Sequence, residues 1–303
     1  MQVSEISEFG APEVLRLAER PDPAPAPDEV VVRIRAANVN PTDLAFRAGV
    51  HSPPGVQLPC VPGWDLAGEV TATGGSADGF APGDRVVGMI PFGRIGGRVG
   101  AYAQAAAVDP FWLAPLPGDV DDAVAATLPL NALTARQALD LIAAPAGSTL
   151  LVTGASGAVG GFATQMAARD GLRVLARASH DDEEWVASLG AGEVLRRGAD
   201  LAAIGPVDAV LDAVPLGPAS AASLRDGGIA VFTRPPGAEP SPGIRFETVL
   251  VQPDAAMLGA LAEDLVAGRL RTRVAEVVPL GAAARAHALA EAGGLRGKVV
   301  MSP

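Results

Sequence analysis

The sequence is poor in the residue types that form disulfides or bind zinc. Its 303 residues include one cysteine, Cys60, and three histidines. A single cysteine can form neither a disulfide within the chain nor a cysteine-rich zinc site. Lysine and tyrosine are just as scarce, because Lys298 and Tyr102 are the single examples of each. We therefore expect chemistry that depends on neither a thiol cluster nor several lysines.

Long apolar runs and clustered positive charge are absent as well. No uncharged apolar stretch is long enough for a membrane-spanning helix, and the opening "MQVSEISEFG" lacks the pattern of a signal peptide. The formal net charge is −11, whereas nucleic-acid binding needs clustered lysine and arginine. We expect a cytoplasmic protein that acts on a small molecule and has no nucleic-acid or membrane partner.

The composition and hydrophobic pattern of the sequence change along the chain. Residues 1–117 are rich in β-branched residues interrupted by glycine and proline, which predicts a β-rich domain with long loops. Residues 118–254 alternate short apolar strands with alanine-rich stretches, including an expected helix over residues 218–226. This alternation predicts an α/β fold with a doubly wound parallel sheet, while residues 255–303 return to mixed patterns.

The stretch "LLVTGASGAVGG" places glycines at positions 154, 157 and 160, between a predicted strand and a predicted helix. Glycine allows a tight turn and lets the backbone approach a diphosphate, and the following helix offers unpaired N–H groups. Because the strand–turn–helix context accompanies the glycines, we predict a dinucleotide-binding turn. Its expected contact residues are Gly154, Ser156, Gly157, Ala158, Val159 and Gly160.

Two enzyme superfamilies use a turn of this kind. The short-chain dehydrogenase pattern fails at Ala158, and the motif lies in the middle of the chain. Those enzymes also need a Tyr-x-x-x-Lys pair for proton transfer, which Tyr102 and Lys298 cannot form. The short-chain interpretation is therefore excluded.

Several ordered motifs instead resemble the zinc-free quinone oxidoreductase branch of the medium-chain dehydrogenase/reductase superfamily. They are "NVNPTDLAFRAG", "LPCVPGWDLAGEV", "PGDRVVG", "GAYAQAAAV", "LPLNALTARQAL" and the segment from residue 251 to 301. The resemblance implies a GroES-like catalytic domain over residues 1–117, completed by about 255–303, and a Rossmann NADP-binding domain over 118–254. It also implies a homodimer.

The same motifs show whether the sequence contains the ligands of a catalytic zinc ion. Zinc-dependent relatives hold a catalytic metal with cysteine and histidine, but Asn40 stands where the first cysteine ligand would be. "PGWD" stands where those relatives have a Gly-His-Glu, and the three histidines are scattered. Because tetrahedral zinc needs three or four such ligands, we expect no metal site.

The end of the strand "RVLARA" indicates which dinucleotide the protein is expected to bind. A Rossmann strand that binds NAD usually ends in an acid that bonds the ribose 2′-OH, but this strand ends at Ala178. Arg177, Ser179 and His180 flank that position and can donate hydrogen bonds to a 2′-phosphate. These residues favour NADP(H) as the cofactor.

Two departures from the family pattern bear on the same site. A lysine that relatives often carry beyond the serine is Asp182 here, and an Asn-Tyr at the next strand end is replaced by Arg196 and Arg197. We expect the two arginines to take over part of the phosphate contact.

The resemblance assigns further residues to the cofactor and the substrate. Asn40 and Asp43 are expected at the nicotinamide, and the remaining cofactor contacts are expected at Thr134, Asp212, Ala213, Val214, Phe232, Thr233 and Lys298. Quinone oxidoreductases often have a tyrosine at the position of Ala45. Arg47, His51 or Tyr102 would then polarise the substrate oxygen, whereas His287 is expected to be structural.

Without zinc to polarise a carbonyl, an activated acceptor is the expected substrate. The leading hypothesis is an NADPH-dependent reductase of a quinone or an α,β-unsaturated carbonyl compound. An enoyl reductase of a biosynthetic pathway, a non-redox enzyme that catalyses cyclisation or addition on the same fold, and a cofactor-sensing protein without turnover remain open alternatives.

Overall fold

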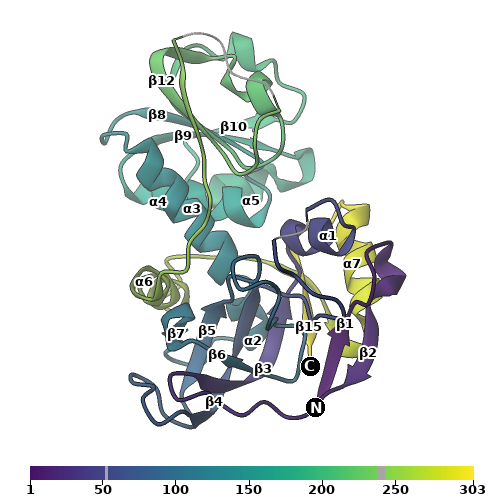
Figure 1. Cartoon of the computed structure of the whole chain (residues 1–303). Coiled ribbons are helices and arrows are strands. Elements are labelled where there is room, and N and C mark those ends of the chain that lie inside the picture. The colour runs from purple at the N-terminus through teal and green to yellow at the C-terminus, as the bar shows by residue number, and fades with distance from the viewer. Residues whose placement is uncertain (52–53, 238–242) are drawn as a thin grey trace. The chain divides into compact units, whose positions relative to one another are not determined.

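The computed structural model describes residues 1–51, 54–237 and 243–303. The chain forms two units. The first unit contains Met1–Leu130, Pro253–Arg269 and Arg273–Pro303, and the second contains Asn131–Gln252 and Leu270–Thr272. The second unit is thus built mainly from the middle of the sequence (Figure 1).

A six-stranded parallel sheet organises the second unit, with the strand order β10-β9-β8-β11-β12-β13. The strands are β8 (Thr149–Thr153), β9 (Arg173–Ala178), β10 (Glu193–Arg196), β11 (Val207–Asp212), β12 (Leu224–Phe232) and β13 (Arg245–Thr248). In chain order this is the 3-2-1-4-5-6 arrangement of dinucleotide-binding proteins. The order reverses between β8 and β11, which places a ligand site at their carboxyl ends.

Helices and short 3₁₀ turns connect these strands. They are α3 (Pro129–Ile142), α4 (Ala158–Arg169), α5 (Glu183–Ser188), η3 (His180–Asp182), η4 (Leu201–Ala203) and η5 (Gly217–Ala221). The helix expected over residues 218–226 is limited to η5, because Leu224 already pairs with Val207 in the parallel sheet. Pairing with the neighbouring strand therefore overrides the helical pattern there.

The first unit is built on a seven-stranded sheet. Its strand order is β14-β15-β3-β4-β5-β7, with β6 paired to β3, and β1 and β2 form a separate hairpin-like pair. The strands are β1 (Gln2–Glu5), β2 (Arg16–Glu19), β3 (Val30–Asn38), β4 (Asp65–Thr73), β5 (Arg85–Met89), β6 (Ala105–Val108), β7 (Leu113–Pro115), β14 (Val274–Pro279) and β15 (Lys298–Ser302). Two strands from the C-terminal end of the chain therefore complete a sheet begun near the N-terminus.

The helices of this unit come from both ends of the chain. They are α1 (Pro41–Arg47), α2 (Asp122–Ala126), α6 (Ala255–Val266), α7 (Ala283–Ala292) and the 3₁₀ turns η1 (Pro12–Val14), η2 (Pro110–Trp112) and η6 (Leu280–Ala282). Most of the motif "NVNPTDLAFRAG", which follows β3, is helical. Pro41 occupies the first turn of α1, where its missing N–H costs nothing.

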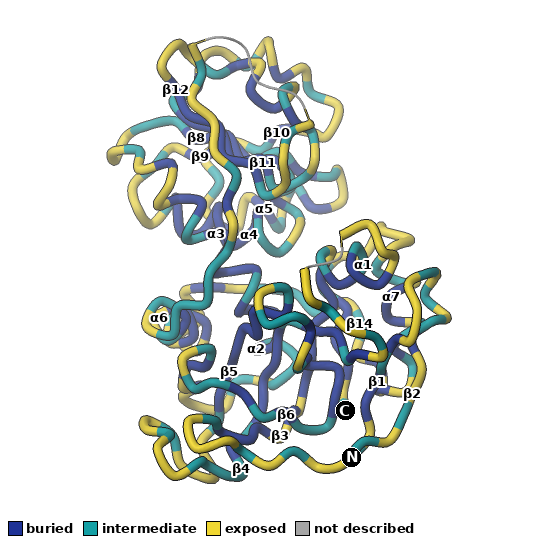
Figure 2. Tube along the Cα trace, in the orientation of Figure 1, coloured by how far each residue is buried: buried dark blue, intermediate teal, exposed yellow. Residues whose placement is uncertain are grey.

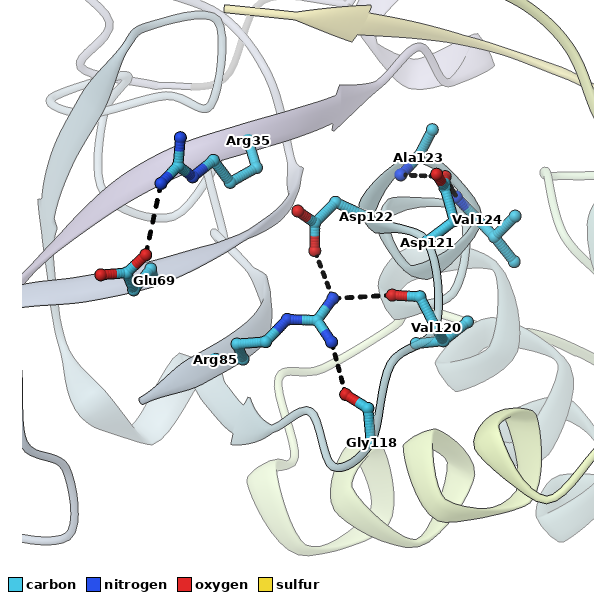
Figure 3. Close-up of polar contacts among 9 residues, drawn as sticks. All are labelled: Arg35, Glu69, Arg85, Gly118, Val120, Asp121, Asp122, Ala123 and Val124. Atoms are coloured by element: carbon cyan, nitrogen blue, oxygen red, sulfur yellow. Dashed lines mark hydrogen bonds and ion pairs between the residues drawn. The ribbon is translucent and has the colours of Figure 1, made fainter. Parts of the chain in front are cut away.

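The segment after residue 117 remains with the first unit. Arg85 of β5 donates to the carbonyls of Gly118 and Val120, over 2.5 and 2.7 Å, and to the Asp122 carboxylate (Figure 3). The Asp121 carboxylate caps α2 by accepting from the Ala123 and Val124 N–H groups. These contacts tie α2 to β5, so the contact-based border between the units follows Leu130.

Each unit has its own apolar core. Figure 2 shows the buried residues concentrated on the strands and on one side of the helices, with exposed residues on the connecting loops. Val30, Leu66, Val86 and Met301 belong to the core of the first unit. Leu151, Val210 and Phe232 belong to the core of the second. The polar groups described next lie at the ends of these strands, on α1 and on the adjoining turns.

Candidate functional site

A glycine-rich turn joins β8 to α4 in the second unit. Gly154 has a φ of +65°, a left-handed conformation that side chains disfavour. The Gly157 N–H donates to the Gly154 carbonyl over 2.9 Å, and the Ala155 N–H donates to the Arg177 carbonyl of β9 over 3.1 Å. These bonds hold the turn in one shape at the carboxyl end of the sheet.

The other two glycines of the turn differ in what surrounds them. A Cβ at position 160 would lie 2.4 Å from the Gly154 carbonyl oxygen, so Gly160 lets α4 pack against the turn. A Cβ at position 157 would meet that oxygen at 3.3 Å and, apart from nearby residues of its own segment, no other described atom within 4 Å. Packing requires Gly160, whereas the space in front of Gly157 is open to a ligand.

The N-terminus of α4 carries unpaired donors. Among the described residues, no side chain caps the helix at Gly157. The first bond within the helix runs from the Gly161 N–H to the Gly157 carbonyl. The N–H groups of Ala158, Val159 and Gly160 therefore have no partner within the helix. Together with the open glycine, this donor set fits the diphosphate of a dinucleotide.

Asp212 organises the neighbouring strand ends. It is buried at the end of β11 and accepts hydrogen bonds from Thr153 Oγ1 at 2.5 Å, the Leu216 N–H at 3.1 Å and the Gly217 N–H at 2.8 Å. Burial raises the pKa of its carboxyl group, and these bonds oppose the rise. Asp212 thus shapes the loop after β11.

The other residues predicted on this side of the sheet lie close by. Val214 packs beside Gly154, where a Cβ would come within 2.5 Å of its Cγ1 atom. Thr233 donates to the Asp212 carbonyl from its N–H and its hydroxyl, both over 3.1 Å. Phe232 is a core residue, and Thr134 is buried on α3. Ala213 links Asp212 to Val214 in the chain.

The end of β9 brings together two of the predicted serines. The Ser179 N–H donates to Ser156 Oγ over 3.1 Å, and the two hydroxyl oxygens lie 3.3 Å apart. The Ser179 hydroxyl also donates to the buried Asp182 carboxylate over 3.0 Å. The turn and the end of β9 are thus joined by a small polar network.

The predicted cations surround this end of the sheet. His180 Nδ1 and Arg196 Nε both lie 3.0 Å from Glu183 Oε1, and their side chains are exposed. The hydrogen bond with His180, together with the charge of Arg196, lowers the pKa of the Glu183 carboxyl group. Arg197 is exposed. The Nε atom of Arg177 is buried and has no partner among the described residues.

In the first unit, four buried polar side chains and one half-buried lysine meet where β3, β4, α1 and β15 come together. We call Asn38, Asn40, Asp43, Asp65 and Lys298 the polar cluster. Asn40 Oδ1 accepts from Asn38 Nδ2 and from the Lys298 ammonium group, each over 3.0 Å. Lys298, predicted to contact the cofactor, thus lies beside Asn40.

Asp65 is the acceptor at the centre of the polar cluster. It accepts from Asn38 Nδ2 at 3.0 Å, Asn40 Nδ2 at 2.8 Å and the Leu130 N–H at 2.9 Å. Burial raises the pKa of Asp65 to about 6, although these bonds oppose the rise. Burial also lowers the pKa of Lys298 to about 8, against the attraction of Asp65 and Asp43.

Asp43 closes the first turn of α1. Its Oδ2 atom accepts from the Asn40 N–H over 2.8 Å, whereas Oδ1 is buried without a partner among the described residues. Burial raises the pKa of this carboxyl group to about 8. The Tyr102 hydroxyl faces it and also lies 3.0 Å from His287 Nε2.

Burial controls the ionisation of Tyr102 and His287. It raises the pKa of Tyr102 well above its usual value, and the nearby Asp43 and Asp65 charges raise it further. Burial lowers the pKa of His287 to about 3, with a further lowering by the Arg47 charge. Both side chains are therefore neutral near neutral pH.

The two remaining predicted residues do not join the polar cluster. Arg47 has a side chain only 2% exposed that donates to the Gly10 carbonyl and pairs with Glu291 of α7. These contacts join Arg47 to the segment before η1 and to α7, and its role in the reaction stays a prediction. His51 is exposed.

Three residues of this site were missing from the sequence-predicted set. Asn38 and Asp65 are central to the polar cluster, and His287 is the partner of Tyr102. Asp65 stands in the motif "PGWD", so its position could have been noticed. In the sequence, Asn38 looks like an ordinary strand residue, and no local pattern predicts its hydrogen bond with Asp65.

The described residues hold neither a metal-binding cluster nor a membrane-spanning helix. In that part of the chain, no group of three or more histidine, cysteine, aspartate or glutamate side chains is arranged to hold a metal ion. Within the same residues, none of the helices combines the length and apolar character needed to span a bilayer.

Comparison with known proteins agrees with this architecture. The model of the alcohol dehydrogenase GroES-like domain matches residues 26–118, and that of the zinc-binding dehydrogenase domain matches residues 189–301. The chain is 30% identical to the 2-methylene-furan-3-one reductase of Solanum lycopersicum, over 100% of the chain and 79% of that protein.

Two further relatives show the same relationship. The chloroplastic NADPH-dependent alkenal/one oxidoreductase of Arabidopsis thaliana is 30% identical, over 98% of the chain and 78% of that protein. The structure of the quinone oxidoreductase from Coxiella burnetii superposes with a TM-score of 0.90 at 28% identity, covering 100% of the chain and 99% of that protein.

The GroES-like sheet and the parallel dinucleotide-binding sheet define a nucleotide-dependent oxidoreductase. The chain belongs to the medium-chain dehydrogenase/reductase superfamily, and its relatives are quinone oxidoreductases and enone reductases. The predicted fold class, the superfamily and the enzyme class are confirmed.

Proposed function

We propose that this enzyme is an NADPH-dependent reductase that transfers hydride to a quinone or an α,β-unsaturated carbonyl compound without zinc. The observation that carries the proposal is the pair of sites within one chain. The second unit offers an uncapped glycine turn, and the first holds a polar cluster of amide, carboxyl and ammonium groups.

The cofactor assignment is supported by the end of β9. Ala178 offers no carboxylate for a ribose 2′-OH, whereas Arg177 has a buried Nε donor without a partner among the described residues. His180 and Arg196 add cationic or donor groups nearby. This donor set fits a 2′-phosphate.

The residues around the dinucleotide have separate tasks in the proposal. The N–H groups at the start of α4 bind the diphosphate, and Asp212 orders the loop that follows β11. When bound, NADPH would supply a hydride, which is one proton together with two electrons. Asn40, Asp43 and Tyr102 belong to the substrate side of the reaction.

The acceptor class is supported by the donors that the polar cluster contains. Zinc catalysis relies on cysteine, histidine or carboxylate ligands around an open coordination position. Here the Asn40 amide and the Asp65 carboxylate bond to each other. An acceptor that already carries an electron-poor carbon, such as a quinone or an enone, does not need a metal to polarise it. The relatives named for quinones and alkenals are consistent with that class.

A panel of acceptors tests this proposal. We expect protein dialysed against a chelator to oxidise NADPH in the presence of naphthoquinones and short enones, and to leave saturated ketones unchanged. Product formation without any change in nicotinamide absorbance would indicate a non-redox reaction. Activity that appears only after zinc is added would contradict the zinc-free mechanism.

Replacing Arg177 tests the choice of NADPH. We expect Arg177→Ala to raise the dissociation constant of NADPH about 10- to 100-fold, because a charged hydrogen bond contributes about 1.5–3 kcal/mol. The dissociation constant of NADH should stay within about twofold, since NADH lacks the 2′-phosphate. Titration of protein fluorescence with each dinucleotide measures both values.

Arg173→Ala is the matched control for this variant. Arg173 begins the same strand, is exposed, and approaches Glu193 at 3.8 Å. We expect the control to bind both dinucleotides as the wild type does. An equal loss of NADPH and NADH binding in Arg177→Ala would overturn the assignment of Arg177.

We also propose that the enzyme is a homodimer. β13 is an edge strand of the parallel sheet, and Phe246 on it is 39% exposed. An exposed edge with an apolar side chain is suited to pairing with a second copy. Sedimentation that finds a monomer at micromolar concentration would contradict this assignment.

A further inference from the structure

Two buried carboxyl groups of the polar cluster share one ammonium group. Asp43 and Asp65 are 1% and 0% exposed, and Lys298 is the cation of the cluster. Burying a charge is costly unless an opposite charge or several hydrogen bonds compensate it. One ammonium group can balance one carboxylate, so the hydrogen bonds decide which of the two is ionised.

The hydrogen bonds around Asp65 favour its ionised form. Its two oxygens accept three N–H donors, from the side chains of Asn38 and Asn40 and from the Leu130 backbone. N–H groups that converge on a carboxyl group stabilise the carboxylate. The Lys298 ammonium group donates to the Asn40 amide oxygen, and the Asn40 amide nitrogen donates in turn to Asp65. Asp65 is therefore the anion that balances Lys298.

The surroundings of Asp43 favour its neutral form. One N–H group, that of Asn40, reaches Oδ2. The Oδ1 atom is buried and has no hydrogen-bond partner among the described residues. If Oδ1 carried a proton, this unpartnered oxygen would become a hydrogen-bond donor directed at the Tyr102 hydroxyl. The pKa of about 8 that burial gives Asp43 agrees with this geometry.

The remaining groups near Asp43 do not supply a second positive charge. His287, on α7, is neutral because burial lowers its pKa to about 3. Arg47, on α1, is paired with Glu291. Tyr102 lies between Asp43 and His287 and can pass a hydrogen bond from one to the other. Asp43, Tyr102 and His287 thus form a buried chain of neutral, proton-carrying groups.

We propose that Asp43 is held as a neutral carboxylic acid and supplies the proton that completes reduction of the acceptor. This inference rests on the proposed function. It identifies a proton donor for an enzyme that has alanine where relatives of this family often carry a tyrosine, at position 45.

The proposed step balances in atoms and charge. Hydride addition to the acceptor leaves a negative charge on its oxygen. The O–H bond of the Asp43 carboxyl group breaks, and an O–H bond forms on the acceptor oxygen. With an enone this gives an enol, which becomes the saturated ketone when its α-carbon takes a proton from water and its O–H proton returns to water. Asp43 is left as a carboxylate, to which the Tyr102 hydroxyl can donate, and a proton from solvent restores the acid before the next turnover.

Infrared spectroscopy tests the state of Asp43 without cofactor or substrate. Ordinary carboxyl groups are ionised at pH 7, so a neutral one gives a separate C=O band. We expect the difference spectrum between the wild type and Asp43→Asn at pH 7 to contain one such band, and to lose it at about pH 10. Asp65 and Asp212 are present in both proteins and cancel. A difference spectrum without the band would overturn the proposal.

Enzyme kinetics test the role of that proton. For an enone, we expect Asp43→Asn to lower kcat at least tenfold while the dissociation constant of NADPH stays within twofold. The wild-type kcat should fall above about pH 8, as Asp43 ionises, and the variant should show no such fall. Lys298 is intact in the variant, so a fall that remains at this pH would assign the titration to Lys298 and overturn the proposal.

A second variant covers the case in which Asp43→Asn does not fold. Tyr102→Phe removes the hydroxyl that faces Asp43, and it should shift the C=O band of the neutral acid and slow its reprotonation. An unchanged band and an unchanged kcat would contradict the proposed chain. If the wild type does not oxidise NADPH with any acceptor, the proposed function fails, and the infrared result still decides whether Asp43 is neutral.

Discussion

Gly157→Val is expected to abolish dinucleotide binding and leave the protein folded. The variant places a branched side chain in front of the N–H groups that begin α4, where the diphosphate would bind. Loss of two charge-assisted hydrogen bonds, each contributing about 1.5–3 kcal/mol, raises the dissociation constants of NADPH and NADH at least about 100-fold. Isothermal titration with each dinucleotide measures the effect.

The fold should tolerate this change because of the local geometry at position 157. The backbone there is extended, with a φ of −83°, and an added Cβ meets the Gly154 carbonyl oxygen at 3.3 Å. Gly75→Val is the matched control, since no described atom other than those of its chain neighbours lies within 4 Å of a Cβ at that position of the first unit. The control should bind dinucleotides normally.

Gly160→Ala is expected to destabilise the fold, in contrast to Gly157→Val. Its Cβ would lie 2.4 Å from the Gly154 carbonyl oxygen, so α4 must move away from the turn. We expect this variant to lose thermal stability, whereas Gly157→Val should melt close to the wild type. Retained dinucleotide binding in folded Gly157→Val would show that the turn does not hold the diphosphate.

His287→Gln is expected to remove much of the protein's sensitivity to acid. His287 has a pKa of about 3 in the folded state and 6.5 as a free group. Between these values the unfolded chain binds a proton that the folded chain does not, so stability is present above pH 6.5 and is lost as the pH falls. From pH 7 to pH 4.5, this loss amounts to about 2–3 kcal/mol.

Urea unfolding at the two pH values measures the effect. Glutamine has no charge to gain, so the variant should lose about 2–3 kcal/mol less than the wild type over this range. Asp43 acts in the opposite sense, because an acid with a raised pKa confers stability that is lost as the pH rises from 3.8 towards 8. Asp43 is present in both proteins, so the comparison isolates His287.

An exposed histidine serves as the control for this prediction. His51 is exposed in the first unit, and His51→Gln should follow the pH dependence of the wild type. Equal losses of stability in His287→Gln and the wild type would mean that His287 is already charged in the folded protein. That result would also remove the neutral chain through Tyr102.

Local sequence patterns predicted the second unit well. The spacing of Gly154, Gly157 and Gly160, and the alternation of strands and helices around them, follow from short-range rules of backbone geometry. The prediction of a helix over 218–226 was wrong because Leu224, in the second half of this segment, pairs with Val207 of the neighbouring strand. A pattern within nine residues does not report that pairing.

The first unit depends on contacts between distant parts of the chain. Arg47 and Glu291 are 244 residues apart, and Tyr102 and His287 are 185 apart. The sequence predicts Arg47 at the substrate, but it does not predict that this side chain is buried and paired with Glu291. The convergence of Asn38, Asp65 and Lys298 likewise depends on the pairing of β3 with β4 and β15.

The measurement that tests the central claim most directly follows deuterium from the cofactor into the product. Metal-free protein would be incubated with an enone and with NADPH deuterated at C4 of the nicotinamide, in ordinary water. We predict one deuterium on the β-carbon of the saturated product, formed in equal amount with NADP⁺, and a proton from the medium on the α-carbon. Product without deuterium and with NADPH unconsumed would contradict hydride transfer by this enzyme.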